Sequence, residues 1–155
     1  MSNNSQPQMQ PPQPDPALKK LQPLVGSWKL KGHLTGSSEE NITGHATFKW
    51  LEGGFFLQQD IELNFMGLPI KSRELIGYNP ETKKFSSNVY SNMSPVPLPY
   101  TWDVEGDTLT ITVNYGPLNA TFTGSLSKFH GAWKPNPGAD PNVNVAYELT
   151  SEPAK

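Results

Sequence analysis

The chain has 155 residues, no cysteine and a formal net charge of −2. This length fits a single domain, and the lack of cysteine excludes disulfides, iron–sulfur clusters, thiolate zinc sites and cysteine nucleophiles. No apolar run approaches the roughly 20 residues of a membrane helix, and a slightly acidic chain does not suit a nucleic-acid-binding protein, which needs a clustered basic face. We therefore expect one domain that binds neither nucleic acid nor membranes.

The first segment, residues 1–16, is rich in Pro, Gln and Asn and has almost nothing to bury. Such a segment cannot offset the entropy lost on ordering, so we predict a disordered tail. We interpret it as a solvated tail rather than a polyproline ligand for a partner, because it carries no aromatic anchor. It lacks the basic start and apolar run of a secretory signal, which indicates a cytoplasmic protein. The folded domain is expected at residues 17–152.

From residue 18 onward the hydrophobic pattern changes from helical to strand-like spacing. Leu18, Leu21 and Val25 fall near a helical period and predict one short helix at 18–24. After Gly26, apolar and polar residues alternate, as is typical of half-buried strands. About ten such segments are separated by turn residues, near 27–34, 42–50, 55–65, 70–78, 85–92, 100–104, 107–114, 118–126, 129–134 and 143–150.

This succession of strands predicts an all-β, up-and-down antiparallel barrel of about ten strands. A long meander exposes two edges unless it closes on itself. A β-sandwich is the alternative, but it usually needs longer crossover connections, and no long connection is evident between the expected strands. A barrel of this size has room either for packed side chains or for one small ligand.

Short motifs resemble those of a known superfamily. Gly26-Ser27-Trp28, at the start of the first expected strand, resembles the G-x-W signature of calycins, which include lipocalins, fatty-acid-binding proteins, avidins and nitrobindins. Further similarity to an uncharacterised bacterial family with a calycin-like barrel comes from the segments 50–57, 76–85 and 106–111. The resemblance runs from about residue 18 to 150. It implies a barrel whose closed end is plugged by Trp28, and it implies no particular activity.

Hairpin registers indicate which side chains face the barrel interior. With Gly67-Leu68 as a turn tip, Phe65 would pair with Ile70, and Glu62 would meet Arg73 on the outer face. The later hairpin would pair Val113 with Leu118. The same alternation turns several polar and aromatic side chains inward among apolar ones, and we predict these as ligand-binding residues: Gln59, Ser72, Glu74, Ser87, Ser91, Tyr100, Trp102 and Tyr147.

Glu74 is the most informative of these residues, because a buried carboxylate needs a partner or takes up a proton. It would either receive a hydroxyl, an amine or a cation from a ligand, or act as the hub of a hydrogen-bond network with Gln59 and Tyr78. Apolar walls with a few polar groups are typical of ligand pockets. The single arginine, Arg73, is expected to face outward. The pattern therefore predicts a small, largely apolar ligand, neutral or cationic rather than a fatty acid.

The chain carries no recognisable catalytic motif. It has no nucleophile elbow, phosphate loop or dinucleotide fingerprint, so no catalytic residue is predicted. Nitrobindins hold haem through a histidine inside the barrel, but His33, His45 and His130 are all expected to point outward. We therefore predict no haem and no other cofactor. His33 and His45 are expected to approach each other without a carboxylate neighbour, which favours ordinary surface residues over a metal site.

Three functions remain open from the sequence. We prefer non-enzymatic binding of a small, largely apolar molecule inside the barrel. The alternatives are a packed barrel that serves as a protein-interaction module, and a small-molecule enzyme with Glu74 as base. The apolar, Pro-rich loop at 93–99 is interpreted as a rigid connection. The other interpretations of this loop are a lip over the barrel and a contact with a second subunit, which would make a homodimer.

Overall fold

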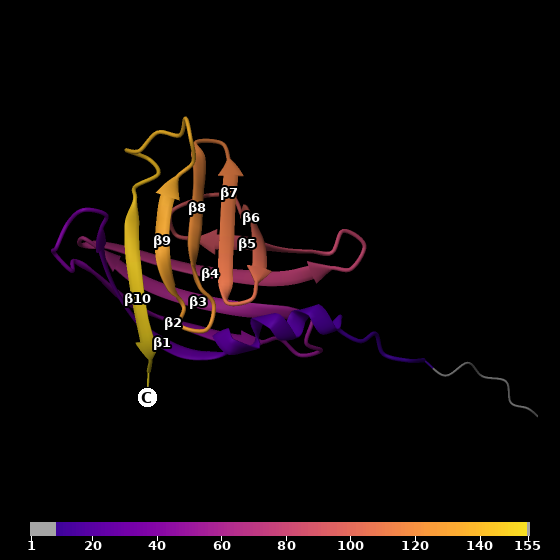
Figure 1. Cartoon of the computed structure of the whole chain (residues 1–155). Helices are drawn as coiled ribbons and strands as arrows, with labels where there is room; N and C mark the ends of the chain where they lie inside the picture. Colours follow the sequence, from indigo (N-terminus) through magenta and orange to yellow (C-terminus); the bar gives the residue numbers. More distant parts are fainter. Residues whose placement is uncertain (1–8, 155) are drawn as a thin grey trace, which may run out of the picture.

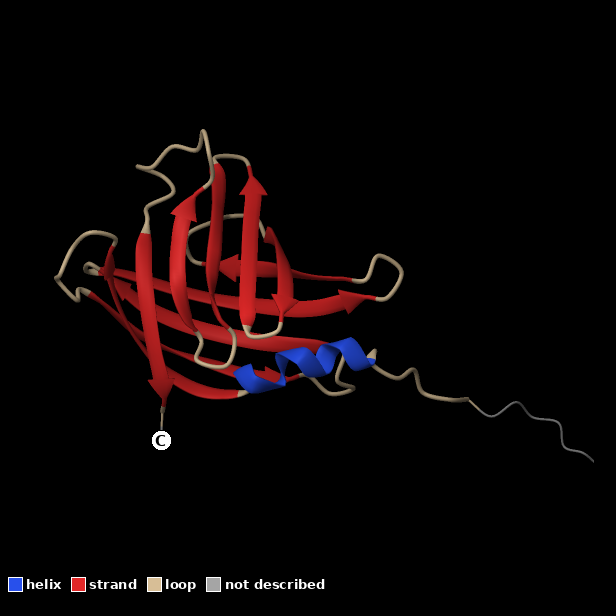
Figure 2. Ribbon diagram, in the orientation of Figure 1, coloured by secondary structure: helices blue, strands red, loops and turns tan. Residues whose placement is uncertain are grey.

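The computed structural model describes residues 9–154, which form ten strands and one short 3-10 helix, η1 (Pro16–Leu24). The strands wrap around a common interior, and η1 lies along the lower side of the views in Figures 1 and 2. The strands are β1 (Gly26–Leu34), β2 (Ile42–Trp50), β3 (Phe56–Phe65), β4 (Leu68–Asn79), β5 (Lys84–Ser91), β6 (Leu98–Glu105), β7 (Thr108–Tyr115), β8 (Leu118–Ser125), β9 (His130–Pro135) and β10 (Tyr147–Pro153).

The sheet closes on itself. Each strand pairs antiparallel with the next along the chain, and β1 pairs with β10 to complete the circle, with Trp28 opposite Pro153 and Leu34 opposite Tyr147. Closure pairs the two edges that an open meander would expose. The prediction of an all-β, up-and-down antiparallel barrel with a short N-terminal helix is therefore confirmed.

The β3–β4 hairpin is shifted by two residues from the predicted register. Its turn is Met66-Gly67, so Phe65 pairs with Leu68 and not with Ile70. Met66 and Gly67 both have positive φ angles, 54° and 94°, as a two-residue hairpin turn of the I′ type requires. The sequence interpretation was wrong because a non-glycine residue takes the left-handed conformation here. A shift of two residues leaves every side chain on its predicted face.

Two other details of the later strands differ from the prediction. In the β7–β8 hairpin Tyr115 pairs with Leu118, so Val113 meets Ala120 instead of Leu118. The last strand begins at Tyr147 rather than at residue 143, because the segment 136–146 forms a long loop between β9 and β10. In contrast, the predicted β4–β5 register is confirmed, with Glu74 opposite Val89 and Ser72 opposite Ser91.

The helix η1 covers one end of the barrel. Its three leucines, at positions 18, 21 and 24, are buried. Trp28 donates a hydrogen bond from Nε1 to the Leu24 carbonyl over 2.9 Å, and its ring lies 5.9 Å from that of Phe129. Trp28 is only 7% exposed. Large side chains thus fill this end, and free interior space lies toward the opposite end.

The segment before η1 contributes its cap. Asp15 accepts a hydrogen bond on Oδ1 from the Ala17 backbone N–H over 2.9 Å, which satisfies one of the free donors at the helix start. Half of the tail predicted at residues 1–16, namely 1–8, lies outside the described residues. Disorder of the tail stays a prediction.

Candidate functional site

A cavity of about 280 Å³ lies inside the barrel and receives side chains from β3 to β10 and from the loops between them. Met93, which is 53% exposed, stands at its outer end, while Phe129 lines the inner end near Trp28. Most of the wall is apolar, with contributions from Ile61, Leu63, Val89, Leu98, Ile111 and Leu149. The barrel is therefore not completely filled by its own side chains.

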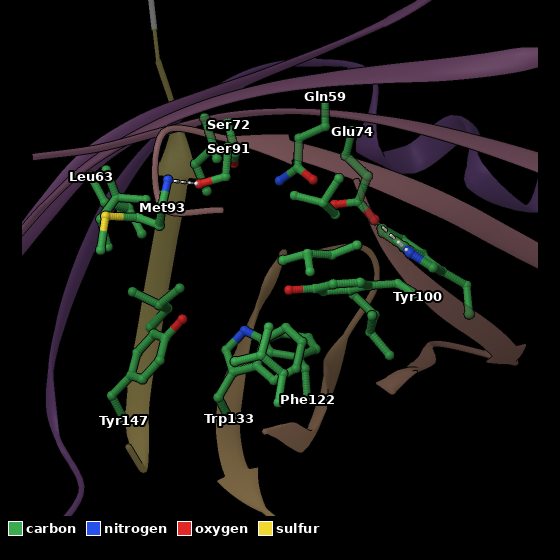
Figure 3. A pocket seen from close by; sticks show the side chains of 18 of the residues that line it. Gln59, Leu63, Ser72, Glu74, Ser91, Met93, Tyr100, Phe122, Trp133 and Tyr147 are labelled. Carbon is green, nitrogen blue, oxygen red and sulfur yellow. Dashed lines mark hydrogen bonds between the residues drawn. The ribbon is translucent and has the colours of Figure 1, made fainter. Parts of the chain in front are cut away.

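Figure 3 shows how the polar groups are divided between two sides of this cavity. Gln59 and Glu74 lie on one side, and Ser72 and Ser91 lie beside them toward the mouth. The opposite side is aromatic, with Tyr100, Phe122, Trp133 and Tyr147.

Among residues 9–154, Glu74 is the only carboxyl group that lines the cavity. It is 8% exposed, and its Oε2 accepts two hydrogen bonds, from the Ser87 hydroxyl over 2.6 Å and from Trp102 Nε1 over 2.8 Å. Burial raises the pKa of Glu74 to about 7, although these two donors favour the ionised form. Near neutral pH the group is therefore poised between a charged and a neutral state.

The hydrogen-bond partners of Glu74 differ from those considered from the sequence. A hub with Gln59 and Tyr78 was one of the two roles considered for Glu74, yet within residues 9–154 neither of these side chains bonds to Glu74. Gln59 does lie directly opposite Glu74 on β3. Trp102 reaches Glu74 from β6, two strands away, and Ser87 lies between them, within 3.1 Å of Trp102 Nε1. Such a contact across strands depends on barrel curvature, which local alternation does not reveal.

Several polar groups in the cavity have no hydrogen-bond partner in the part of the chain that the structure describes. They are the Gln59 amide, the Ser72 hydroxyl, Glu74 Oε1, the Tyr100 and Tyr147 hydroxyls and Trp133 Nε1. Ser91 differs, because its hydroxyl accepts from the Met93 backbone N–H over 3.0 Å. Burial, and then the nearby Glu74, raise the pKa of Tyr100 to about 12. The pKa of Tyr147 is also raised, mainly by burial, so both hydroxyls are protonated.

The structure places seven of the eight predicted site residues on the cavity wall: Gln59, Ser72, Glu74, Ser91, Tyr100, Trp102 and Tyr147. Ser87 stands behind Glu74 and supports it without lining the cavity. Sequence reasoning did not single out Trp133, whose ring lies 5.9 Å from that of Tyr100 and 5.7 Å from that of Phe122. The alternation that places His130 outward also turns Gly131 and Trp133 inward, and it would have found this residue.

The histidines do not line the cavity. Their predicted neighbours are partly wrong: His45 lies opposite Lys29, and His33 lies opposite Glu148, so the two histidines do not meet. His45 does have a carboxylate neighbour, because its Nε2 is 2.7 Å from Glu62 Oε2. Across residues 9–154, however, no group of three or more His, Asp or Glu side chains is arranged to hold a metal ion.

The charges on the outer wall pair differently from the predicted register. Arg73 contacts Asp60, with Nε 2.7 Å from Oδ1, whereas Glu62 contacts Lys71 over 2.9 Å. The expected Glu62–Arg73 pair is thus replaced through the two-residue shift of the hairpin. Arg73 nevertheless points away from the cavity, as predicted, and its side chain is 60% exposed.

Comparison with known proteins identifies the family of this chain. No curated protein matches the chain. Over residues 9–154, no helix has the length and apolar character needed to cross a membrane. The family described as "Protein of unknown function (DUF1579)" matches residues 13–134. The match takes in every wall residue discussed above except Tyr147 and Leu149, which lie beyond it on β10. The chain belongs to this family of proteins of unknown function, DUF1579.

Proposed function

We propose that this protein is a cytoplasmic, calycin-like barrel that binds a small, largely apolar molecule in its interior and does not transform it. The observation that carries the proposal is the cavity itself. It combines apolar walls with several polar groups that have no partner in residues 9–154. These groups face the cavity and are not sealed off from it, since the one buried side-chain atom without a partner among the described residues is Asn41 Oδ1. Their free hydrogen-bonding capacity is therefore available to a ligand that enters the cavity.

The cavity volume supports a ligand of one or two rings. Engineered cavities of about 150 Å³ accept benzene, and natural ligand pockets begin at roughly 300 Å³. The cavity of about 280 Å³ lies between these values. A barrel serving only as a packed interaction module would have no need for this space, so its volume favours ligand binding over that alternative.

The charge of the lining supports a neutral or cationic ligand. Among the described residues, no Lys, Arg or His lines the cavity, whereas Glu74 does. A fatty-acid carboxylate would therefore enter an apolar space without a counter-ion and close to a second carboxyl group. Burying an unpaired charge is strongly unfavourable.

The surroundings of Glu74 support binding rather than catalysis. Acid–base catalysis by Glu74 would be favoured by a second titratable group within hydrogen-bond reach. The two side chains that bond to Glu74 are the Ser87 hydroxyl and the Trp102 indole, and neither titrates near neutral pH. Tyr100, which faces the same cavity, has a pKa of about 12.

Native mass spectrometry of freshly purified protein tests the proposal. We expect a co-purifying small molecule that is lost on denaturation. Ser72→Phe, which would fill the cavity from the β4 wall, should abolish this extra mass. Ser86→Phe is the matched control, because Ser86 is exposed on β5, and it should retain the ligand. A bound mass that survives Ser72→Phe would place the ligand outside the barrel.

A homodimer, one of the other interpretations of the loop at 93–99, would use the exposed side chains of Met93 and Val96. Sedimentation analysis of the chain, with and without Val96→Ser, tests it separately from ligand binding, because Val96 is not among the residues that line the cavity. A dimer held by this loop should weaken in the variant.

A further inference from the structure

The two oxygens of the Glu74 carboxyl group have different surroundings. Oε2 accepts from both Ser87 and Trp102. Oε1 has no partner within residues 9–154 and belongs to a side chain on the cavity wall. Figure 3 shows the Glu74 carboxyl group beside the Gln59 amide at the edge of the open space. One oxygen is thus held in place by the protein, and the other is free to meet a ligand.

Glu74 Oε1 differs from the other unpartnered groups of the cavity, because an ionised carboxylate oxygen can only accept hydrogen bonds. The Gln59 amide and the Ser72, Tyr100 and Tyr147 hydroxyls each combine an acceptor oxygen with N–H or O–H donors, and the Trp133 indole N–H can only donate. A complementary ligand therefore needs a hydrogen-bond donor at Glu74, while the amide and hydroxyl groups can meet donors or acceptors.

Aromatic side chains face the carboxyl group across the cavity. The Trp133 ring is close to those of Tyr100 and Phe122, and Tyr147 lies next to them on the same side. Aromatic faces attract cations, and the attraction grows when the pair is shielded from water. The same rings also provide flat apolar area for the body of a ligand.

We propose that the cavity binds a primary amine carried on an apolar body of one or two rings, held as the ammonium ion with Glu74 Oε1 as its counter-ion. This inference rests on the proposed ligand-binding function and specifies the class of ligand. An ammonium group supplies three donors and one positive charge. Gln59, paired with Glu74 across β3 and β4, is placed to accept a second of these hydrogen bonds.

Within residues 9–154, no neighbour of Glu74 on the cavity wall is a cation. The strand β3 presents Gln59, β5 presents Ser87, and β6 presents Trp102 and Tyr100, none of which carries a positive charge. The strand β10 adds one titratable side chain to the cavity wall, Tyr147, which carries no positive charge. Binding an ammonium ion therefore requires Glu74 to be ionised, and protonation of Glu74 should weaken binding as the pH falls.

Calorimetric titration with three probes of the same shape tests the inference: phenethylamine, phenethyl alcohol and phenylacetate. At about pH 8 we expect the amine to bind at least tenfold more tightly than the alcohol, as a hydrogen bond to a charged group predicts. Phenylacetate should bind most weakly. With a Glu74 pKa of about 7, amine affinity should fall about tenfold between about pH 8 and pH 6, while alcohol affinity stays constant.

Glu74→Gln removes the charge but keeps an acceptor for Ser87 and Trp102. It should lower amine affinity at least tenfold and leave alcohol affinity unchanged. Glu62→Gln, on the outer wall, is the matched control and should change neither. If Glu74→Gln does not fold, the change in amine affinity of the natural chain between about pH 8 and pH 6 is the deciding measurement. Equal binding of amine and alcohol would overturn the inference but not the proposed function. Binding of none of the probes at millimolar concentration, with no co-purifying ligand, would overturn both.

Discussion

Glu74 carries a free-energy cost that depends on pH. Its pKa is about 7 in the folded protein because the group is buried, against an ordinary value of 4.5. Between these two values the folded state binds the proton and the unfolded chain does not. Stability contributed by the protonated group is therefore fully present below about pH 4.5 and is lost as the pH rises through about 7.

We expect the free energy of unfolding to fall by roughly 3 kcal/mol between about pH 5 and pH 8, since each pH unit of separation between the two values is worth about 1.4 kcal/mol. Urea titrations across this range measure it. In Glu74→Gln this decline should disappear, and the variant should be the more stable protein at about pH 8. The outer carboxylates Asp60, Glu62 and Asp107 have lowered pKa values and stay ionised throughout. A parallel decline in wild type and variant would assign the effect to another group.

Trp28 has a structural role in the closed end of the barrel. Its ring is 7% exposed and packs against Phe129, and its indole N–H is bonded to Leu24. Trp28→Ala should leave a cavity and cost about 3–5 kcal/mol, which for a domain of this size lowers Tm by on the order of 10 °C. Trp28→Phe, which keeps a ring and loses the hydrogen bond, should cost clearly less. Thermal unfolding followed by circular dichroism compares the two. An alanine variant as stable as the natural chain would show that Trp28 is no plug.

At the scale of the elements, the turns decide how neighbouring strands align. The β7–β8 turn is Gly116-Pro117, with a φ of 59° at Gly116. Glycine at the first central position suits a two-residue hairpin turn of the II′ type. A two-residue turn, there of the I′ type, also brings Phe65 opposite Leu68 in the β3–β4 hairpin. The predicted registers failed at these two places because they assumed the wrong turn.

The start of η1 gives a prediction about the tail. Removing residues 1–12 should leave Tm within a degree or two, because the segment has almost no apolar surface to bury. Removing residues 1–16 also deletes the Asp15 cap, whose loss costs about 1 kcal/mol. Differential scanning calorimetry of the two truncated proteins separates these contributions. A loss of several degrees on removal of residues 1–12 would mean that the tail docks onto the barrel.

At the scale of the whole molecule, the barrel wall separates two kinds of charge. On the outside, Asp60, Glu62, Lys71 and Arg73 form exposed ion pairs, which contribute little to stability. On the inside, Glu74 is the carboxyl group of the cavity, and no basic side chain of residues 9–154 lines it. The barrel thus presents a weakly acidic interior to any ligand.

This separation of charge predicts that the protein binds fatty acids weakly. A fluorescent long-chain fatty acid should bind weakly, and Arg73→Ala should not change its affinity, because Arg73 lies outside and contacts Asp60. Fluorescence titration of the natural chain and the variant measures both quantities. Tight binding that vanishes in Arg73→Ala would contradict the orientation of β4 and the proposed role of Glu74 together.

The sequence by itself determined the barrel and the faces of its strands. Alternation with a period of two is a local property, so it places Glu74 inward and Arg73 outward whatever the exact register. An error of two residues in β3–β4 pairing therefore left the predicted lining almost intact.

Only the tertiary structure decided how that lining is used. Trp102 reaches Glu74 across two strands, and the amide of Gln59, although opposite Glu74, has no hydrogen-bond partner within residues 9–154. These contacts depend on curvature and on side-chain direction, which alternation does not encode. The same is true of the volume left between facing walls, because it is the difference between the space that the closed sheet encloses and the side chains that fill it. The volume of the side chains follows from the sequence, whereas the space that the sheet encloses is known only once the barrel is closed.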